Sequence, residues 1–314
     1  MNIRRFIFST GIIFYMFSAQ AQKIKISLNL KPEFIFETEL INSISFIQEI
    51  MGINYTTGTN ISNLLTSQVI NKSNDTGYEL KSNYSRMEFS LINNGMDLKM
   101  SSEANDDDPN PMNSMMKLLV EKDFIQSISL SGDIWKTEGL DELILNVLDS
   151  IDLSTDQLRE FKDAFIQSFG AGTLAETFML NSVVFTDSLV GVGDTWVRNF
   201  VISPYGIPMN LKLNISVKHL FGDYAVFMTE GILVTKNDSM KNNTLISSPY
   251  HLEGTQVSEI RINLENGLIE NNITTQYIQG KISISSQDSS GNIEIPITIK
   301  SRSTIRSKQK KSYD

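Results

Sequence analysis

Apolar and polar residues alternate along both ends of the chain. The clearest run is 211–217, where every second residue is apolar, and residues 24–30 and 293–299 repeat the pattern. This period of two predicts strands with one buried face and one face in water. Pro296 lies inside the last run and cannot donate a ladder hydrogen bond, which predicts an edge strand or a bulge there.

Turn-forming dipeptides separate these runs from one another. Asn94-Gly95 and Asn266-Gly267 supply the positive φ angles of tight hairpins, and Gly222-Asp223 and Ser290-Gly291 are similar. Consecutive hairpins place neighbouring strands antiparallel, with one face buried and the other in water. The pattern therefore predicts a meander and not a parallel α/β sheet.

The middle of the chain changes to a helical period. Apolar residues there recur every three or four positions, which places them along one side of a helix. Helical stretches are expected at about 111–121 and 139–180. Within the longer stretch, a capping box at Ser154 would begin a second helix, and Gly170 and Gly172 would end it.

Together these elements predict an α+β, β-dominated fold. We expect a large twisted antiparallel sheet, a meander that could curl into a half-barrel, with a few amphipathic helices packed on one face. Residues 22–300 would form a single α+β domain, in which the strands of both ends lie together. A two-domain chain divided near 181–190 is the alternative. Residues 301–314 are basic and are expected to be a disordered tail.

The N-terminus has the three parts of a secretory signal peptide. A basic start with Arg4 and Arg5 precedes an apolar run, Phe6 to Phe17, and small residues follow up to Ala21. This run is too short to span a bilayer, which needs about 20 apolar residues. Residues 1–21 are therefore predicted to be removed by cleavage after Ala21, which places the protein in the periplasm or outside the cell.

Composition narrows the range of partners. The chain has no cysteine, which excludes disulfides, a thiolate nucleophile and lipid attachment through cysteine. Without Arg4 and Arg5, 25 basic residues face 36 acidic ones, a net charge of −11. An acidic body repels phosphate backbones, so no nucleic-acid partner is expected. No integral membrane span is expected after the signal, since no later segment is long and apolar enough.

Motifs for catalysis, cofactors and metals are missing from the sequence. No phosphate-binding loop or nucleophile elbow occurs, and the two histidines, His219 and His251, have the sequence context of surface residues. The acidic run Asp106–Asp108 lacks the glycine and distal glutamate of a helix–loop–helix calcium site, so a loop before a helix is the simpler interpretation. We expect no catalytic residue, no cofactor and no metal.

The most distinctive segment is Val184–Trp196. Gly191 and Gly193 permit a sharp turn, followed by Asp194, and Trp196 then begins a strand as a large anchoring side chain, so the segment predicts a structural turn. This V-G-D-x-W pattern resembles an uncharacterised family of exported β-rich proteins of Bacteroidota. Further similarities lie at Tyr84-Ser-Arg-Met and around Gly132. The resemblance implies the fold class and export, and it brings no activity.

Three hypotheses about function follow. In the first, the exported protein is non-catalytic and binds a lipid or another apolar small molecule between the sheet and the helices. In the second, it is an envelope scaffold that binds a protein partner and no small ligand. In the third, it is a hydrolase of cell-surface material. For the first hypothesis, the candidate ligand-binding residues are those of the Met- and Phe-rich helical face: Met112, Met115, Met116, Phe161, Phe165 and Phe169.

Overall fold

The structure is a computed structural model of the whole chain. It describes residues 23–73, 76–93, 96–108, 110–150, 162, 165–236, 250–285 and 292–310. The predicted signal peptide lies outside the described residues.

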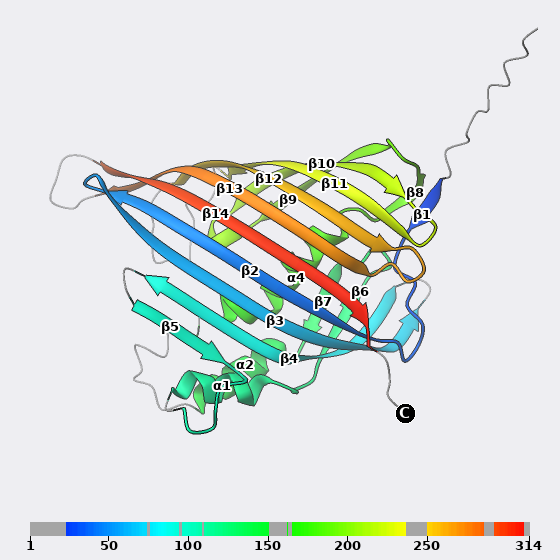
Figure 1. Cartoon of the computed structure of the whole chain (residues 1–314), viewed down its shortest axis with the longest axis horizontal. Coiled ribbons are helices and arrows are strands. Elements are labelled where there is room, and N and C mark those ends of the chain that lie inside the picture. The colour runs from blue at the N-terminus through cyan, green and yellow to red at the C-terminus, as the bar shows by residue number, and fades with distance from the viewer. Residues whose placement is uncertain are drawn as a thin grey trace, which may run out of the picture.

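One large antiparallel sheet dominates the described part of the chain (Figure 1). Its strands follow the order β7-β6-β4-β3-β2-β14-β13-β12-β11-β10-β9, and β5 pairs with β4 beside β6. The strands are β2 (Ile35–Ile50), β3 (Ile53–Ser73), β4 (Gly77–Asn93), β5 (Met96–Ser101), β6 (Phe124–Ile128), β7 (Ile134–Glu138), β9 (Thr195–Ile202), β10 (Met209–Leu220), β11 (Tyr224–Thr235), β12 (Tyr250–Asn263), β13 (Ile269–Ser285) and β14 (Asn292–Gln309).

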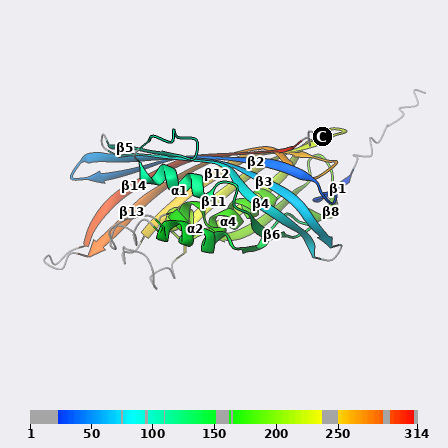
Figure 2. The same cartoon turned by 90° about the horizontal axis from the view of Figure 1, so that it is seen from below.

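The sheet curves over a layer of helices. Figure 2 shows the strands as an arch, with the helices beneath it on the concave side. The helices are α1 (Pro111–Leu119), α2 (Leu140–Asp149) and α4 (Ala171–Ser182), and a short 3-10 turn, η1 (Pro204–Gly206), follows β9. The predicted β-dominated α+β architecture, with helices on one face of a large antiparallel sheet, is therefore confirmed.

The alternation of apolar and polar residues places the apolar side chains on one face of the sheet and the polar side chains on the other. In β10, residues at every second position from Met209 to Val217 are at most 1% exposed, and the residues between them face the solvent side. These buried residues belong to the largest core cluster, which runs across β9 to β14. Because the apolar side chains lie on the concave face, the helices and the loops can cover them.

Strands from the two ends of the described chain lie side by side at the centre of the sheet. β2 pairs with β14 along thirteen residue pairs, from Gln48↔Ile297 to Phe36↔Gln309. This pairing joins the N-terminal hairpins to the C-terminal meander in one continuous sheet. The sequence prediction that the strands of both ends lie together is confirmed.

The expected disordered tail from residue 301 is wrong for residues 301–309. These residues form the second half of β14, which pairs with β2 as far as Gln309 and with β13 as far as Ile305. Their basic side chains face acidic residues of β2, with Lys308 3.3 Å from Glu37 and Arg306 3.4 Å from Glu39. Pairing with β2 along its whole length satisfies backbone groups of this stretch, and composition alone does not reveal this.

Pro296 does not mark an edge strand, because β14 lies in the interior of the sheet. It is paired with Lys281 of β13, and the pairing of β14 with β2 begins one residue later, at Ile297. Pro296 therefore lies where β14 has a neighbour on one side only, a position at which the missing N–H group is tolerated.

The first predicted strand is shorter than expected and joins a different sheet. β1 (Ile24–Ile26) pairs with β8 (Thr186–Val190) in a separate two-stranded sheet. Residues 27–30 continue as irregular chain. Their backbone is hydrogen-bonded to two turns instead. The Leu28 N–H donates to the Leu130 carbonyl oxygen at 3.3 Å, and the Asn29 N–H donates to the Asn266 carbonyl oxygen at 3.0 Å.

The helical middle agrees with the sequence pattern in part. Gly170 precedes α4 as expected for a break, but Gly172 lies inside α4 and does not end a helix. The predicted helix start at Ser154 and residue Phe161 lie outside the described residues. Among the described residues, no helix has the length and apolar character needed to cross a membrane.

Candidate functional site

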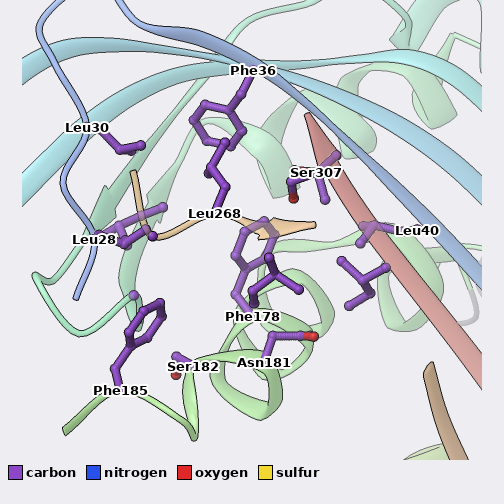
Figure 3. A pocket seen from close by; sticks show the side chains of 16 residues that line it. Leu28, Leu30, Phe36, Leu40, Phe178, Asn181, Ser182, Phe185, Leu268 and Ser307 are labelled. Carbon is purple, nitrogen blue, oxygen red and sulfur yellow. Dashed lines mark hydrogen bonds between the residues drawn. The ribbon is translucent and has the colours of Figure 1, made fainter. Parts of the chain in front are cut away.

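An apolar pocket lies between the concave face of the sheet and helix α4 (Figure 3). Its cavity volume is about 50 Å³, and the pocket is partly open to solvent. Leu40 and Ser307 lie on one side in Figure 3, and Leu28 and Leu30 lie on the other. None of the residues that line the pocket carries a charge.

The sheet wall of the pocket comes from strands that are distant in sequence. Phe36, Thr38 and Leu40 are alternate residues of β2, and Ile305 and Ser307 stand beside them on β14. The register pairs Thr38 with Ser307 and Leu40 with Ile305, which sets all of these side chains on the same face. The wall therefore exists only because the two ends of the chain pair.

The helix wall is the C-terminal half of α4. It contributes Phe178, Asn181 and Ser182, and Phe185 follows from the segment after the helix. Asn181 Oδ1 accepts a hydrogen bond of 2.5 Å from Nδ2 of Asn272 on β13. Ser182 Oγ donates to a carboxylate oxygen of Asp133. These bonds hold α4 against the sheet.

One end of the pocket is closed by the irregular segment 28–30. Tyr78 connects it to the sheet, because its hydroxyl donates to the Leu28 carbonyl at 3.1 Å and accepts from the Leu30 N–H at 3.2 Å. Lys72 Nζ donates to the Leu30 carbonyl at 3.1 Å. The polar backbone of the segment is thus satisfied, and Leu28 and Leu30 turn into the pocket.

The two hydroxyl groups of the sheet wall bond each other. Thr38 Oγ1 and Ser307 Oγ are 2.9 Å apart, and either atom can be the donor. Thr38 is 1% exposed. Each hydroxyl carries one hydrogen, and the bond between the two uses only one of them. The pair therefore retains one donor hydrogen and several lone pairs beside an otherwise apolar wall.

The candidate ligand-binding residues from the sequence lie in a different place. Met115, Met116, Phe165 and Phe169 are buried in the second core cluster, with Met112 packed against it. The rings of Phe165 and Phe169 are 4.5 Å apart. These described residues fill the space between α1, α2 and the strands β3 to β5, and none of them lines the pocket.

The predicted structural turn precedes β9. Gly193 has a φ of 89°, a value that favours glycine. Asp194 Oδ2 accepts from the Gly191 N–H at 2.9 Å and lies 3.3 Å from Lys23 Nζ, and these two contacts lower the pKa of the carboxyl. Trp196 then packs edge-on against Phe227, with ring centroids 6.2 Å apart. The turn at 191–194 leads into β9, and none of its residues lines the pocket.

Several other polar groups of the described residues are paired within the protein. Among the residues that the structure describes, no three His, Asp or Glu side chains are grouped to hold a metal ion. Asp106 of the acidic run forms an ion pair of 2.7 Å with Lys117. Glu176 of α4 is partly buried, which raises its pKa, and its carboxylate accepts from the Ser203 N–H at 3.3 Å. This carboxylate connects α4 to the residue before η1.

The sequence contains one signal for the pocket, and it lies on a strand and not on a helical face. Phe36, Thr38 and Leu40 alternate with charged residues, which identifies a strand with an inward face. The partner strand β14 follows more than 240 residues later, so the pattern alone does not reveal which side chains share the wall.

The family of the chain emerges from a comparison of its sequence. Residues 75–269, which are 195 of the 314, match the family described as "Family of unknown function (DUF6263)". The chain belongs to the DUF6263 family. The DUF6263 segment runs from the start of β4 to the start of β13, so it contains α4 but neither β2 nor β14. No curated protein matches the sequence.

Solved structures resemble the DUF6263 protein only weakly. An outer membrane channel from Pseudomonas putida F1 is 7% identical, with a TM-score of 0.21, over 90% of this chain and 97% of that chain. OpdK from Pseudomonas aeruginosa, solved with vanillate, is 9% identical, with a TM-score of 0.16, over 87% of this chain and 99% of that chain.

Proposed function

We propose that this DUF6263 protein is an exported, non-catalytic protein that holds a lipid or another apolar molecule between its sheet and helix α4. The observation that carries the proposal is the uncharged pocket enclosed by β2, β14, α4 and the segment 28–30. Pockets of mostly apolar lining with a few polar groups are the usual binding sites for small apolar ligands. The Thr38–Ser307 hydroxyl pair is the polar group that would orient the ligand.

Export is proposed on separate grounds. The basic start, short apolar run and small residues up to Ala21 have the order of a secretory signal. The resemblance of the V-G-D-x-W segment to exported proteins of Bacteroidota supports the same location outside the cytoplasm. After cleavage the protein would act in the periplasm or outside the cell, where a carrier can shield an apolar molecule from water.

Ligand binding is tested by filling the pocket. Ile305 of β14 is 6% exposed and lines the pocket, whereas Ile293 of the same strand is 56% exposed. The neutral fluorescent dye N-phenylnaphthylamine should bind the wild-type protein, and Ile305→Trp should weaken binding by about tenfold or more, since the indole occupies the ligand space. Ile293→Trp is the matched control and should bind as the wild type does. Equal binding by both variants would place the dye elsewhere and contradict the proposal.

Export is tested in cells. The full-length chain should be recovered from the periplasmic or extracellular fraction with Gln22 as its first residue, since cleavage follows Ala21. Replacing Ala21 with a bulky residue, Ala21→Trp, should block cleavage at this site. Recovery of uncleaved wild-type protein from the cytoplasm would refute the proposed address and leave the pocket proposal intact.

A further inference from the structure

Charge is kept away from the pocket by the pleat of β14. Ile305 and Ser307 face the pocket, and the residues that alternate with them, Arg306 and Lys308, point to the opposite face of the sheet. There they meet acidic residues of β2, with Arg306 3.4 Å from Glu39 and Lys308 3.3 Å from Glu37. β14 carries most of the basic residues of the C-terminus, and none of its basic side chains faces the pocket.

A charged ligand headgroup would find no counter-charge among the lining residues. Asn181 already accepts from Asn272 and donates to the Thr177 carbonyl, and Ser182 donates to Asp133. Burying an ionised carboxylate without a counter-charge is costly, and such a group remains in water or takes up a proton instead. The pocket thus disfavours fatty acids in their ionised form.

The Thr38–Ser307 pair offers a different partner. Its two oxygens are 2.9 Å apart, and one of the two hydroxyl hydrogens is not used by the bond between them. A neutral ligand oxygen, from an alcohol or an ester carbonyl, can accept that hydrogen. An alcohol can also donate its own hydrogen to the hydroxyl oxygen of Thr38 or Ser307.

We propose that the pocket selects an uncharged amphiphile with an apolar chain and a hydroxyl or ester oxygen that hydrogen-bonds the Thr38–Ser307 pair. This inference rests on the proposed ligand-binding function and names the class of ligand. The apolar chain lies among Leu28, Leu30, Phe178 and Leu268, and the oxygen lies at the sheet wall.

The test compares ligands of equal chain length on the full mature protein. Dodecanol, methyl dodecanoate, dodecanoate and dodecane are each used at pH 8 to displace bound N-phenylnaphthylamine. The alcohol and the ester should bind at least about tenfold more tightly than ionised dodecanoate, because only the acid must lose its hydration without a counter-charge. Dodecane, which has no oxygen, should bind more weakly than dodecanol by about fivefold.

A double variant, Thr38→Val with Ser307→Ala, isolates the hydroxyl pair. It should lower the affinity for dodecanol by about fivefold and leave the affinity for dodecane unchanged. Thr275→Val is the matched control, because Thr275 is exposed on the other face of β13, and it should alter neither affinity.

The outcomes separate the two proposals. If dodecanoate binds as tightly as dodecanol, or if the double variant keeps the preference for the alcohol over the alkane, the ligand class is wrong and the pocket still binds apolar molecules. If the dye and all four ligands fail to bind the folded wild-type protein, the proposed function itself fails. Circular dichroism of the double variant shows whether it has kept the fold.

Discussion

Arg198 donates a hydrogen bond of 2.7 Å from Nη2 to the backbone carbonyl oxygen of Phe185. Arg198 lies on the edge strand β9 opposite the buried Leu213 of β10, so its side chain faces the concave side. Two residues earlier, Trp196 Nε1 donates to the Val183 carbonyl at 3.3 Å. The edge of the sheet thus holds the segment that follows α4, and with it the helix wall of the pocket.

Removing the Arg198 donor should destabilise the protein. Arg198→Met leaves the Phe185 carbonyl without this partner, and we expect the free energy of unfolding to fall by about 1–3 kcal/mol. Urea unfolding followed by circular dichroism measures the change. Arg302→Met, at an exposed position of β14, is the control and should change stability by less than about 0.5 kcal/mol. Equal losses in the two variants would contradict the anchoring role.

The two tryptophans should report different environments. Trp196 packs against Phe227 in the core, whereas Trp135 is 62% exposed. In Trp135→Phe the remaining emission of Trp196 should be blue-shifted and poorly quenched by acrylamide. In Trp196→Phe the emission of Trp135 should be red-shifted and readily quenched. Similar quenching of the two variants would be inconsistent with the packing of β9.

The hairpin turn at Gly267 should tolerate alanine less well than the turn at Gly52. Both glycines have nearly equal φ angles, 76° and 77°, so alanine meets the same backbone strain at each, about 1–2 kcal/mol. A Cβ at Gly267 would lie 2.4 Å from the Ser27 carbonyl oxygen, and a Cβ at Gly52 would meet nothing within 4 Å.

We therefore expect Gly267→Ala to lower the melting temperature clearly more than Gly52→Ala does, as measured by differential scanning calorimetry. The difference between the two variants reports the contact with the segment 27–30, because the backbone strain of alanine is nearly the same at both positions. Identical melting temperatures would show that this segment does not pack on the turn.

Glu176 should make stability depend on pH. Burial raises its pKa above the usual 4.5 despite the hydrogen bond from Ser203, so the folded protein binds this proton more tightly than the unfolded chain does. The stabilisation is complete below about pH 4.5 and is lost as the pH rises through the raised pKa.

Glu176→Gln imitates the protonated form. It should be more stable than the wild type at pH 7, and the difference should vanish as the pH falls below 4.5. Glu259→Gln, at an exposed position of β12, is the control and should follow the wild type across the range. A Glu176→Gln variant that is less stable than the wild type at pH 7 would mean that the carboxylate is needed as an anion for its bond to Ser203.

Local patterns were sufficient for most of the elements. The alternation in 211–217 predicted β10 and its buried face, and the dipeptides Gly222-Asp223 and Asn266-Gly267 predicted hairpins that the register confirms. The helical period predicted α1 and α2. These features depend on neighbours within a few residues, so the sequence contains the information that specifies them.

Only the tertiary structure decided which strands share a face and where an empty space remains. The described methionines and phenylalanines of the helical face pack in the core, as apolar side chains do when they fit together at high density. The pocket instead lies where β2 meets β14, and its wall there includes Thr38 and Ser307, residues separated by 269 positions. Periodicity assigns a side chain to a face of its own strand, but the packing of distant segments determines what lies opposite it.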